Sequence, residues 1–195
     1  MIHKVLSAKK IIFILCILSN TLSAQELVIE NTSKLSTSIS GEYLFGGQIY
    51  NDAFFYNSGF GIHAQLRYSI NPQLELGGGL AHLKLENERF IPVYFDMIHY
   101  KNDKKNSSCI QTQIGYSKGT HITTQQLDNY KFKGGPYISI GIGRKIFITD
   151  NLSSLIIISY KHQFAQLSYE GAFHNTHSEI LNYDIISCSL YLKYL

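Results

Sequence analysis

Apolar and polar residues alternate along much of this chain. In the clearest stretch, residues 60–70, every second residue from Phe60 to Ile70 is apolar, and small or polar residues lie between them. A period of two is typical of a β-strand with one apolar face. Strands of this kind are predicted at residues 35–45, 60–70, 109–117, 137–143 and 186–194.

Three further segments are less regular. Residues 74–85 contain Gly77, Gly78 and Gly79, which predict a β-bulge that exchanges the two faces of the strand. Residues 89–101 also alternate between two faces. Pro92, which has no backbone N–H to donate, lies near one end of this segment, where a β-ladder tolerates a missing donor. Residues 152–166 are apolar on both sides at 155–158, where β-branching favours a strand over a short helix. The total is eight strands, and closed bacterial barrels have an even number.

The links between these segments differ in length. Those at 71–72, 102–107 and 149–151 are short, those at 48–53, 117–132 and 168–181 are longer, and the link near Asn87 is short again. Outer-membrane barrels have short periplasmic turns and longer outer loops. This pattern therefore predicts that both termini lie on the periplasmic side.

The first residues form a separate unit. Lys9 and Lys10 precede an apolar run at 11–18, and small or polar residues follow up to Ala24. This order is typical of a secretory signal peptide. We expect a signal peptide at 1–24, a short periplasmic lead-in at 25–33 and a barrel domain at 34–195. No later run is apolar and long enough for a membrane-spanning helix.

Composition agrees with a barrel wall. Charged residues make up 16% of the chain and aromatic residues 13%, with three prolines and no tryptophan. The net charge of +3 forms no basic stripe with interleaved aromatic residues, so no nucleic-acid partner is expected. Of the two cysteines in the mature chain, alternation turns Cys109 inward and Cys188 outward on strands that are not neighbours, which predicts free thiols.

Charged residues share the polar face of the predicted strands. An eight-stranded barrel is just wide enough for side chains to fill, so charges inside it must pair or form hydrogen bonds. We therefore predict a packed polar network in the lumen, with a narrow conduction path as the alternative. Its members are Glu42, His63, Arg67, Glu75, Asp96, Lys161 and Lys193.

Two stretches resemble a known family. ERFIPVYFDMIHY at 88–100 is followed by a Lys-rich turn and by IQTQIGYSKG at 110–119, and GFGIHAQLRYSINPQLELGGGL fills 59–80. They resemble the small outer-membrane β-barrel proteins of Bacteroidota, the OmpA/OmpX-like outer membrane protein beta-barrel domain group. The resemblance implies an outer-membrane barrel, and most members have no assigned reaction. Such barrels commonly end in an aromatic residue that the insertion machinery recognises, whereas here Tyr194 precedes a terminal Leu195.

Catalytic and metal sites have weak support in the sequence. Outer-membrane lipid A deacylases place a serine two residues from a histidine on the same face, but Phe164 holds that position beside His162, and Ser168 and Glu170 lie further on. The loop residues His121, His174 and His177 lack the cysteine and carboxylate partners of a dedicated metal site. We therefore expect no catalytic residue, metal or cofactor.

Together these features predict an outer-membrane barrel without catalytic activity, which has a structural role or binds partners through its surface loops. The expected partners are outer-membrane lipid or lipopolysaccharide, the insertion machinery at the C-terminal strand, and a surface ligand at 117–132 or 168–181. The alternatives are a lipid A-modifying enzyme, a narrow channel, and a periplasmic lipocalin-like carrier with its apolar face turned inward.

Overall fold

The computed structural model of the protein describes residues 35–50, 53–86, 88–121, 131–170 and 176–194. The signal peptide and lead-in expected at 1–33 lie outside these residues. The described chain is all β, and it contains no helix long and apolar enough to cross a membrane. Its strands are β1 (Leu35–Tyr50), β2 (Ala53–Asn71), β3 (Leu74–Leu85), β4 (Glu88–Tyr100), β5 (Ser107–His121), β6 (Lys131–Thr149), β7 (Leu152–Glu170) and β8 (Thr176–Tyr194).

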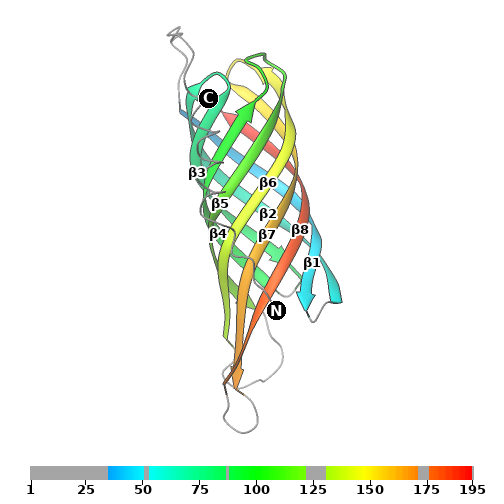
Figure 1. Ribbon diagram of the computed structural model, residues 1–195. Helices are drawn as coiled ribbons and strands as arrows, with labels where there is room; N and C mark the ends of the chain where they lie inside the picture. Colours follow the sequence, from blue (N-terminus) through cyan, green and yellow to red (C-terminus); the bar gives the residue numbers. More distant parts are fainter. Residues whose placement is uncertain (1–34, 51–52, 87, 122–130, 171–175, 195) are drawn as a thin grey trace, which may run out of the picture. The chain divides into compact units, whose positions relative to one another are not determined.

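Each strand pairs antiparallel with the next, and β8 pairs with β1 to close the barrel (Figure 1). The predicted fold class, an eight-stranded antiparallel up-and-down β-barrel, is confirmed. Short turns join β2 to β3, β4 to β5 and β6 to β7 at one end, the turn end. At the first of these turns the side-chain oxygen of Asn71 accepts hydrogen bonds from the backbone N–H groups of Gln73 (2.9 Å) and Leu74 (2.8 Å). The side chain thereby supports a tight reversal of the chain.

At the opposite end, the loop end, the strands are longer than predicted. The ranges 117–132 and 168–181 were expected to be loops, but β5 continues to His121, β6 begins at Lys131, and β7 and β8 pair as far as Glu170 and Thr176. The first expected loop, 48–53, is likewise mostly strand. Alternation fades in these segments because backbone pairing continues where the outward face no longer has to be apolar.

The predicted bulge at Gly77, Gly78 and Gly79 is wrong. Pairing between β3 and β4 runs in one register across the three glycines, and the register shifts elsewhere, for instance beside Ile70 in β2. The apolar residues that suggested an exchange of faces, Ala81, Leu83 and Leu85, point inward and are fully buried. They are apolar because the interior itself is apolar at the loop end.

Other predictions of side-chain direction are confirmed. The segment 152–166 is part of β7, with Ile156 and Ile158 exposed and Leu155 and Ile157 buried. Cys109 is buried and Cys188 is exposed, and both are free thiols on β5 and β8, which are not neighbours.

The interior is layered. At the loop end it holds an apolar cluster that includes Leu44, Leu83, Phe90 and Tyr183, and near the turn end a smaller cluster that includes Ile98 and Leu155. Buried polar and charged side chains lie between these two clusters and beside them. This interior holds most of the buried charged side chains of the described chain.

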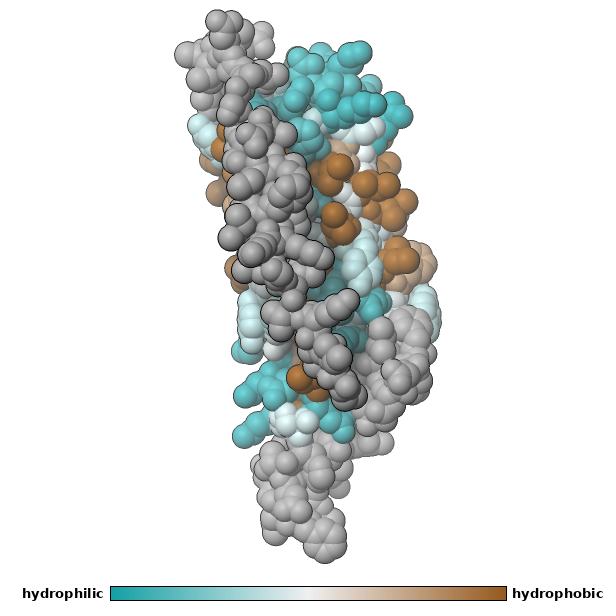
Figure 2. All heavy atoms as spheres, in the orientation of Figure 1, coloured by the Kyte–Doolittle hydropathy of each residue, from teal (hydrophilic) through white to brown (hydrophobic). Residues whose placement is uncertain are grey.

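The outer wall has the opposite character. Large apolar side chains are exposed on every strand, and in Figure 2 they gather in a brown region between hydrophilic ends. We call these exposed side chains the apolar belt. On the successive strands it includes Ile39, Phe60, Leu80, Val93, Ile114, Ile140, Ile158 and Ile186.

Candidate functional site

The seven charged residues predicted for the lumen all point into the barrel and are buried. Their positions follow from strand alternation, because each has the same parity as the small polar residues of its strand. They come from six strands: Glu42 from β1, His63 and Arg67 from β2, Glu75 from β3, Asp96 from β4, Lys161 from β7 and Lys193 from β8.

Glu42 is held by partners on three other strands. Its Oε1 lies 2.7 Å from His63 Nε2, and its Oε2 lies 2.8 Å from Lys161 Nζ. The hydroxyl of Ser189 also donates to Oε2, at 2.9 Å. A buried carboxylate needs partners of this kind, because an unpaired charge inside a protein is very costly.

Arg67 and Asp96 form a second buried ion pair, through Arg67 Nε and Asp96 Oδ2. The other carboxylate oxygen accepts hydrogen bonds from the side-chain amides of Gln111 (2.7 Å) and Gln113 (3.0 Å). The guanidinium also donates to Ser38 Oγ at 2.9 Å. The contacts satisfy both charged groups without a ligand.

Neutral side chains link these two ion pairs on one side of the barrel. Tyr94 Oη lies 2.8 Å from His63 Nδ1 and accepts a hydrogen bond from Gln65 Nε2 at 2.9 Å. Gln65 Oε1 in turn accepts a hydrogen bond from Arg67. A continuous chain of contacts therefore runs from Glu42 to Arg67.

On the other side the link passes through Tyr137. Its hydroxyl donates to Gln113 Oε1 at 2.9 Å and accepts from Lys161 Nζ at 3.2 Å. Because Gln113 also binds Asp96 and Lys161 also binds Glu42, the contacts form a closed circuit across the barrel. We call it the interior ring: Glu42, His63, Tyr94, Gln65, Arg67, Asp96, Gln113, Tyr137 and Lys161.

Gly79 of β3 lies between two ring members, because it pairs with Gln65 of β2 on one side and with Tyr94 of β4 on the other. A Cβ atom added at Gly79 would lie 2.7 Å from Gln65 Cγ and 2.9 Å from Tyr94 Oη. Such contacts are shorter than real Cβ atoms tolerate. Gly79 therefore leaves the space in which Gln65 and Tyr94 meet.

A separate pair occupies the interior beside the ring. Lys193 Nζ forms an ion pair with Glu75 Oε1, and Tyr100 Oη donates to Glu75 Oε2 at 3.4 Å. The ammonium group also lies 5.9 Å from the centre of the Tyr100 ring. Within the described chain, each of the seven predicted residues thus contacts an ionisable side chain of the opposite type: an acidic residue meets a basic residue or a histidine.

Several ring members were not singled out from the sequence: Tyr94, Tyr137, Gln65 and Gln113. The available signal was parity, because Tyr94 is two residues from Asp96, and Gln65 lies between His63 and Arg67. Parity places these side chains inside the barrel but does not say which of them meet across it. That depends on strand stagger and side-chain length.

The outward face carries a different polar cluster. His162 Nδ1 lies 2.7 Å from Asp184 Oδ1, and Tyr160 donates a hydrogen bond to the same carboxylate. Phe164 stacks edge-on against His162 with ring centres 4.4 Å apart. Asp184, from β8, was not predicted beside His162. Ser168 lies six residues along β7 from His162.

The remaining sequence candidates, His174 and the side chains of His121, Glu170 and His177, lie outside the part of the chain that the structure describes. Within that part, no group of three or more His, Cys, Asp or Glu side chains could hold a metal ion.

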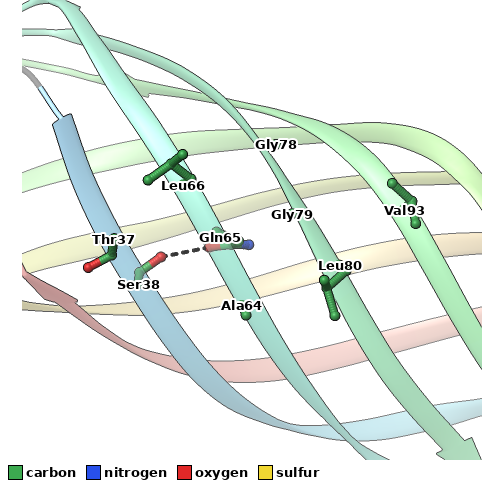
Figure 3. A pocket seen from close by; sticks show the side chains of 9 residues that line it. All are labelled: Thr37, Ser38, Ala64, Gln65, Leu66, Gly78, Gly79, Leu80 and Val93. Carbon is green, nitrogen blue, oxygen red and sulfur yellow. Dashed lines mark hydrogen bonds between the residues drawn. The ribbon is translucent and has the colours of Figure 1, made fainter.

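Two shallow grooves open on the outer wall. The larger, about 540 Å³, lies over β1 to β4, where Gly78 and Ala64 leave space between Leu66, Leu80 and Val93 (Figure 3). A Cβ atom added at Gly78 would meet a single neighbour, at 3.4 Å. Exposed apolar side chains line most of both grooves, and each groove also reaches one member of the interior ring, Gln65 in the larger and Glu42 in the smaller.

Comparison with known proteins identifies the fold. No family model matches the chain, and no curated protein is significantly similar to it in sequence. Among solved structures, the outer membrane protein OprG from Pseudomonas aeruginosa superposes with a TM-score of 0.55 at 7% identity, over 83% of this chain and 96% of that one. Neisserial surface protein A gives 0.54 at 10% identity, over 85% and 100%. The chain therefore has the fold of small outer-membrane β-barrels.

Proposed function

We propose that this protein is an integral β-barrel of the outer membrane without catalytic activity, which supports the envelope or binds partners at its loop end. The apolar belt carries the proposal. On all eight strands the outward positions hold large apolar side chains that are roughly half exposed, such as Ile142 (68%), Val93 (65%) and Ile114 (59%). Water-soluble proteins rarely expose so continuous an apolar surface.

Strand length supports the same proposal. A tilted membrane strand needs about 9–11 residues, and the shortest strand here, β3, has 12. The longer strands, such as β7 with 19 residues, extend beyond the membrane thickness at the loop end. The hairpin ends would then project outside, where partner binding is expected.

The interior argues against the other hypotheses. A lipocalin-like carrier needs an apolar cavity inside and charges outside, whereas here buried ion pairs fill the centre and apolar side chains cover the wall. A channel needs a continuous water-filled path, but the interior ring and the apolar clusters occupy the lumen. For a lipid A-modifying enzyme, His162 has Asp184 as a partner but Phe164 in place of the nearby serine.

The proposed partners are outer-membrane lipid or lipopolysaccharide at the belt and the insertion machinery at β8, which ends at Tyr194. A surface ligand would bind at 117–132 or 168–181. The first range includes the ends of β5 and β6, and the second includes the ends of β7 and β8. The resemblance to the Bacteroidota OmpA/OmpX-like group belongs to this proposal too, as does export by a cleaved signal peptide.

The deciding experiment is fractionation of native envelopes, followed by washes in high salt and in carbonate. We expect the protein to stay in the outer membrane and to migrate differently on a denaturing gel when unheated and when boiled, because a folded barrel resists detergent. Release into the soluble fraction, or identical migration of the two samples, contradicts the proposal.

A further inference from the structure

Basic side chains gather on the outward face at the loop ends of four neighbouring strands. Lys118, Lys131 and Lys133 are exposed, and Lys84 and Arg89 are half-buried. We call this set the basic rim. Its members are Lys84 of β3, Arg89 of β4, Lys118 of β5, and Lys131 and Lys133 of β6.

Strand register brings the basic rim together. Lys84 pairs directly with Arg89 across β3 and β4, and Arg89 pairs with Thr120, two residues from Lys118. Between β5 and β6, Ser117 Oγ contacts the backbone of Gly135 at 3.3 and 3.4 Å, which places Lys118 beside the segment that carries Lys133. Five basic residues from four strands thus form one surface.

The basic rim begins where the apolar belt ends. On β4, Ile91 and Val93 lie two and four residues after Arg89 on the same outward face. On β5, Tyr116, which is 64% exposed, is two residues from Lys118 on the same face. Lys84 Nζ lies 5.7 Å from the centre of the Phe60 ring, so its stem follows the belt while its charge lies at the edge. Basic side chains at this level face the headgroup region of a membrane.

Among the described residues, no acidic side chain forms an ion pair with the basic rim. In the same part of the chain, Arg89 Nε is buried without a hydrogen-bond partner. Glu86 is exposed in the adjoining turn, and Glu88 points inward. On the opposite side of the barrel, β7 and β8 present Gln166 and Asp184 outward instead.

We propose that the basic rim binds the phosphate groups of a phosphorylated lipid in the outer leaflet, with the acyl chains of that lipid lying along the apolar belt of β3 to β6. This inference rests on the proposed function, since it requires that the loop end faces outward from the membrane. The chemistry is that of Lys and Arg with phosphate oxygens. Each rim charge is expected to strengthen binding about fivefold.

The test uses the mature protein folded in zwitterionic detergent micelles, with binding measured by native mass spectrometry. The probes are a hexa-acylated lipid A with two phosphates and the same lipid after enzymatic removal of both phosphates. The variant is R89Q/K118Q/K133Q. The control, K101Q/K104Q/K105Q, removes equal charge at the turn between β4 and β5, where all three lysines are exposed.

We expect the rim variant to bind the phosphorylated lipid about a hundredfold more weakly and the control to stay within about twofold of the wild type. Equal binding of the rim variant and the wild type overturns the inference, as does equal binding of the two lipids. Displacement of the lipid by inorganic phosphate at matched concentration also overturns it, because the site would then take a soluble anion.

Failure of the inference can be told apart from failure of the proposed function. The heat-dependent gel shift of the rim variant reports whether the barrel is folded, independently of lipid binding. A folded variant with unchanged lipid binding contradicts the rim alone. A wild-type protein that leaves the membrane on washing contradicts the proposed function whatever the micelle experiment shows.

Discussion

Several side chains in the interior are charged, buried and paired with an opposite charge, so each one affects the stability of the barrel. Arg67 and Asp96 are both at most 1% exposed in their side chains, as are Glu42 and Lys161. A buried ion pair is weak evidence for added stability, yet removing one partner is expensive because the other charge stays buried. The interior ring is therefore a place where small substitutions should have large effects.

Asp96→Asn tests this at one position. The substitution keeps the shape of the side chain but leaves the Arg67 guanidinium without its counter-charge, and we expect a loss of about 3–5 kcal/mol in the free energy of unfolding. Urea unfolding of the barrel in lipid vesicles measures it. Asp150→Asn is the control, because Asp150 is exposed and lies 3.6 Å from Lys105; no measurable change is expected there. Equal stability of both variants contradicts the prediction.

Two glycines offer a matched pair of substitutions. Gly79→Ala puts a methyl group against Gln65 and Tyr94, and we expect a loss of about 1–3 kcal/mol in the free energy of unfolding from overpacking. Gly41→Ala places the same methyl group on the outer wall, where no atom lies within 4 Å, and should leave stability unchanged. The same unfolding assay compares them, and an unaffected Gly79→Ala variant would show that the ring does not need this space.

At the scale of the strand, alternation predicted the number of strands, which face each presents and the positions of the seven lumen charges. It failed at residues 81–85, because apolar residues there line an apolar interior and so mimic a change of face. It also ended strands too early at the loop end, where Lys118 and Lys133 lie on paired backbone outside the belt. Alternation of apolar and polar residues shows only what each face of a strand contacts. Backbone pairing between strands continues where the outward face is no longer apolar.

Lipid exposure of the strands is testable by Leu66→Arg and Leu190→Arg. Both leucines lie in the belt, 51% and 52% exposed, and an arginine near the membrane midplane should cost about 2–4 kcal/mol. Thr120→Arg, outward on β5 at the loop end, should cost about 0–1 kcal/mol. The readout is the fraction of protein that becomes heat-modifiable after insertion into vesicles. Insertion of both leucine variants at the wild-type level would reverse the assignment of the outer face.

For the whole barrel, the packed lumen predicts poor conduction. We expect no porin-like conductance steps for the wild type in planar bilayers. The double variant Y94A/Y137A should give measurable steps, because it removes two aromatic side chains from the lumen. Tyr116→Ala, on the outer wall, is the control and should behave like the wild type. Porin-like steps in the wild type would show that the side chains leave an open path.

The closed circuit of the interior ring bears on how the barrel is assembled. Glu42 lies near the start of the described chain, and its partners Lys161 and Ser189 lie near its end, so they meet when β1 and β8 come together. A sheet inserted before that seam forms would leave Glu42 with His63 of β2 but without Lys161 and Ser189, and would leave the Lys161 ammonium group without its carboxylate. Half-formed species are thus disfavoured as intermediates, and we expect insertion and closure to occur as one concerted event, with few trapped forms between the unfolded chain and the finished barrel.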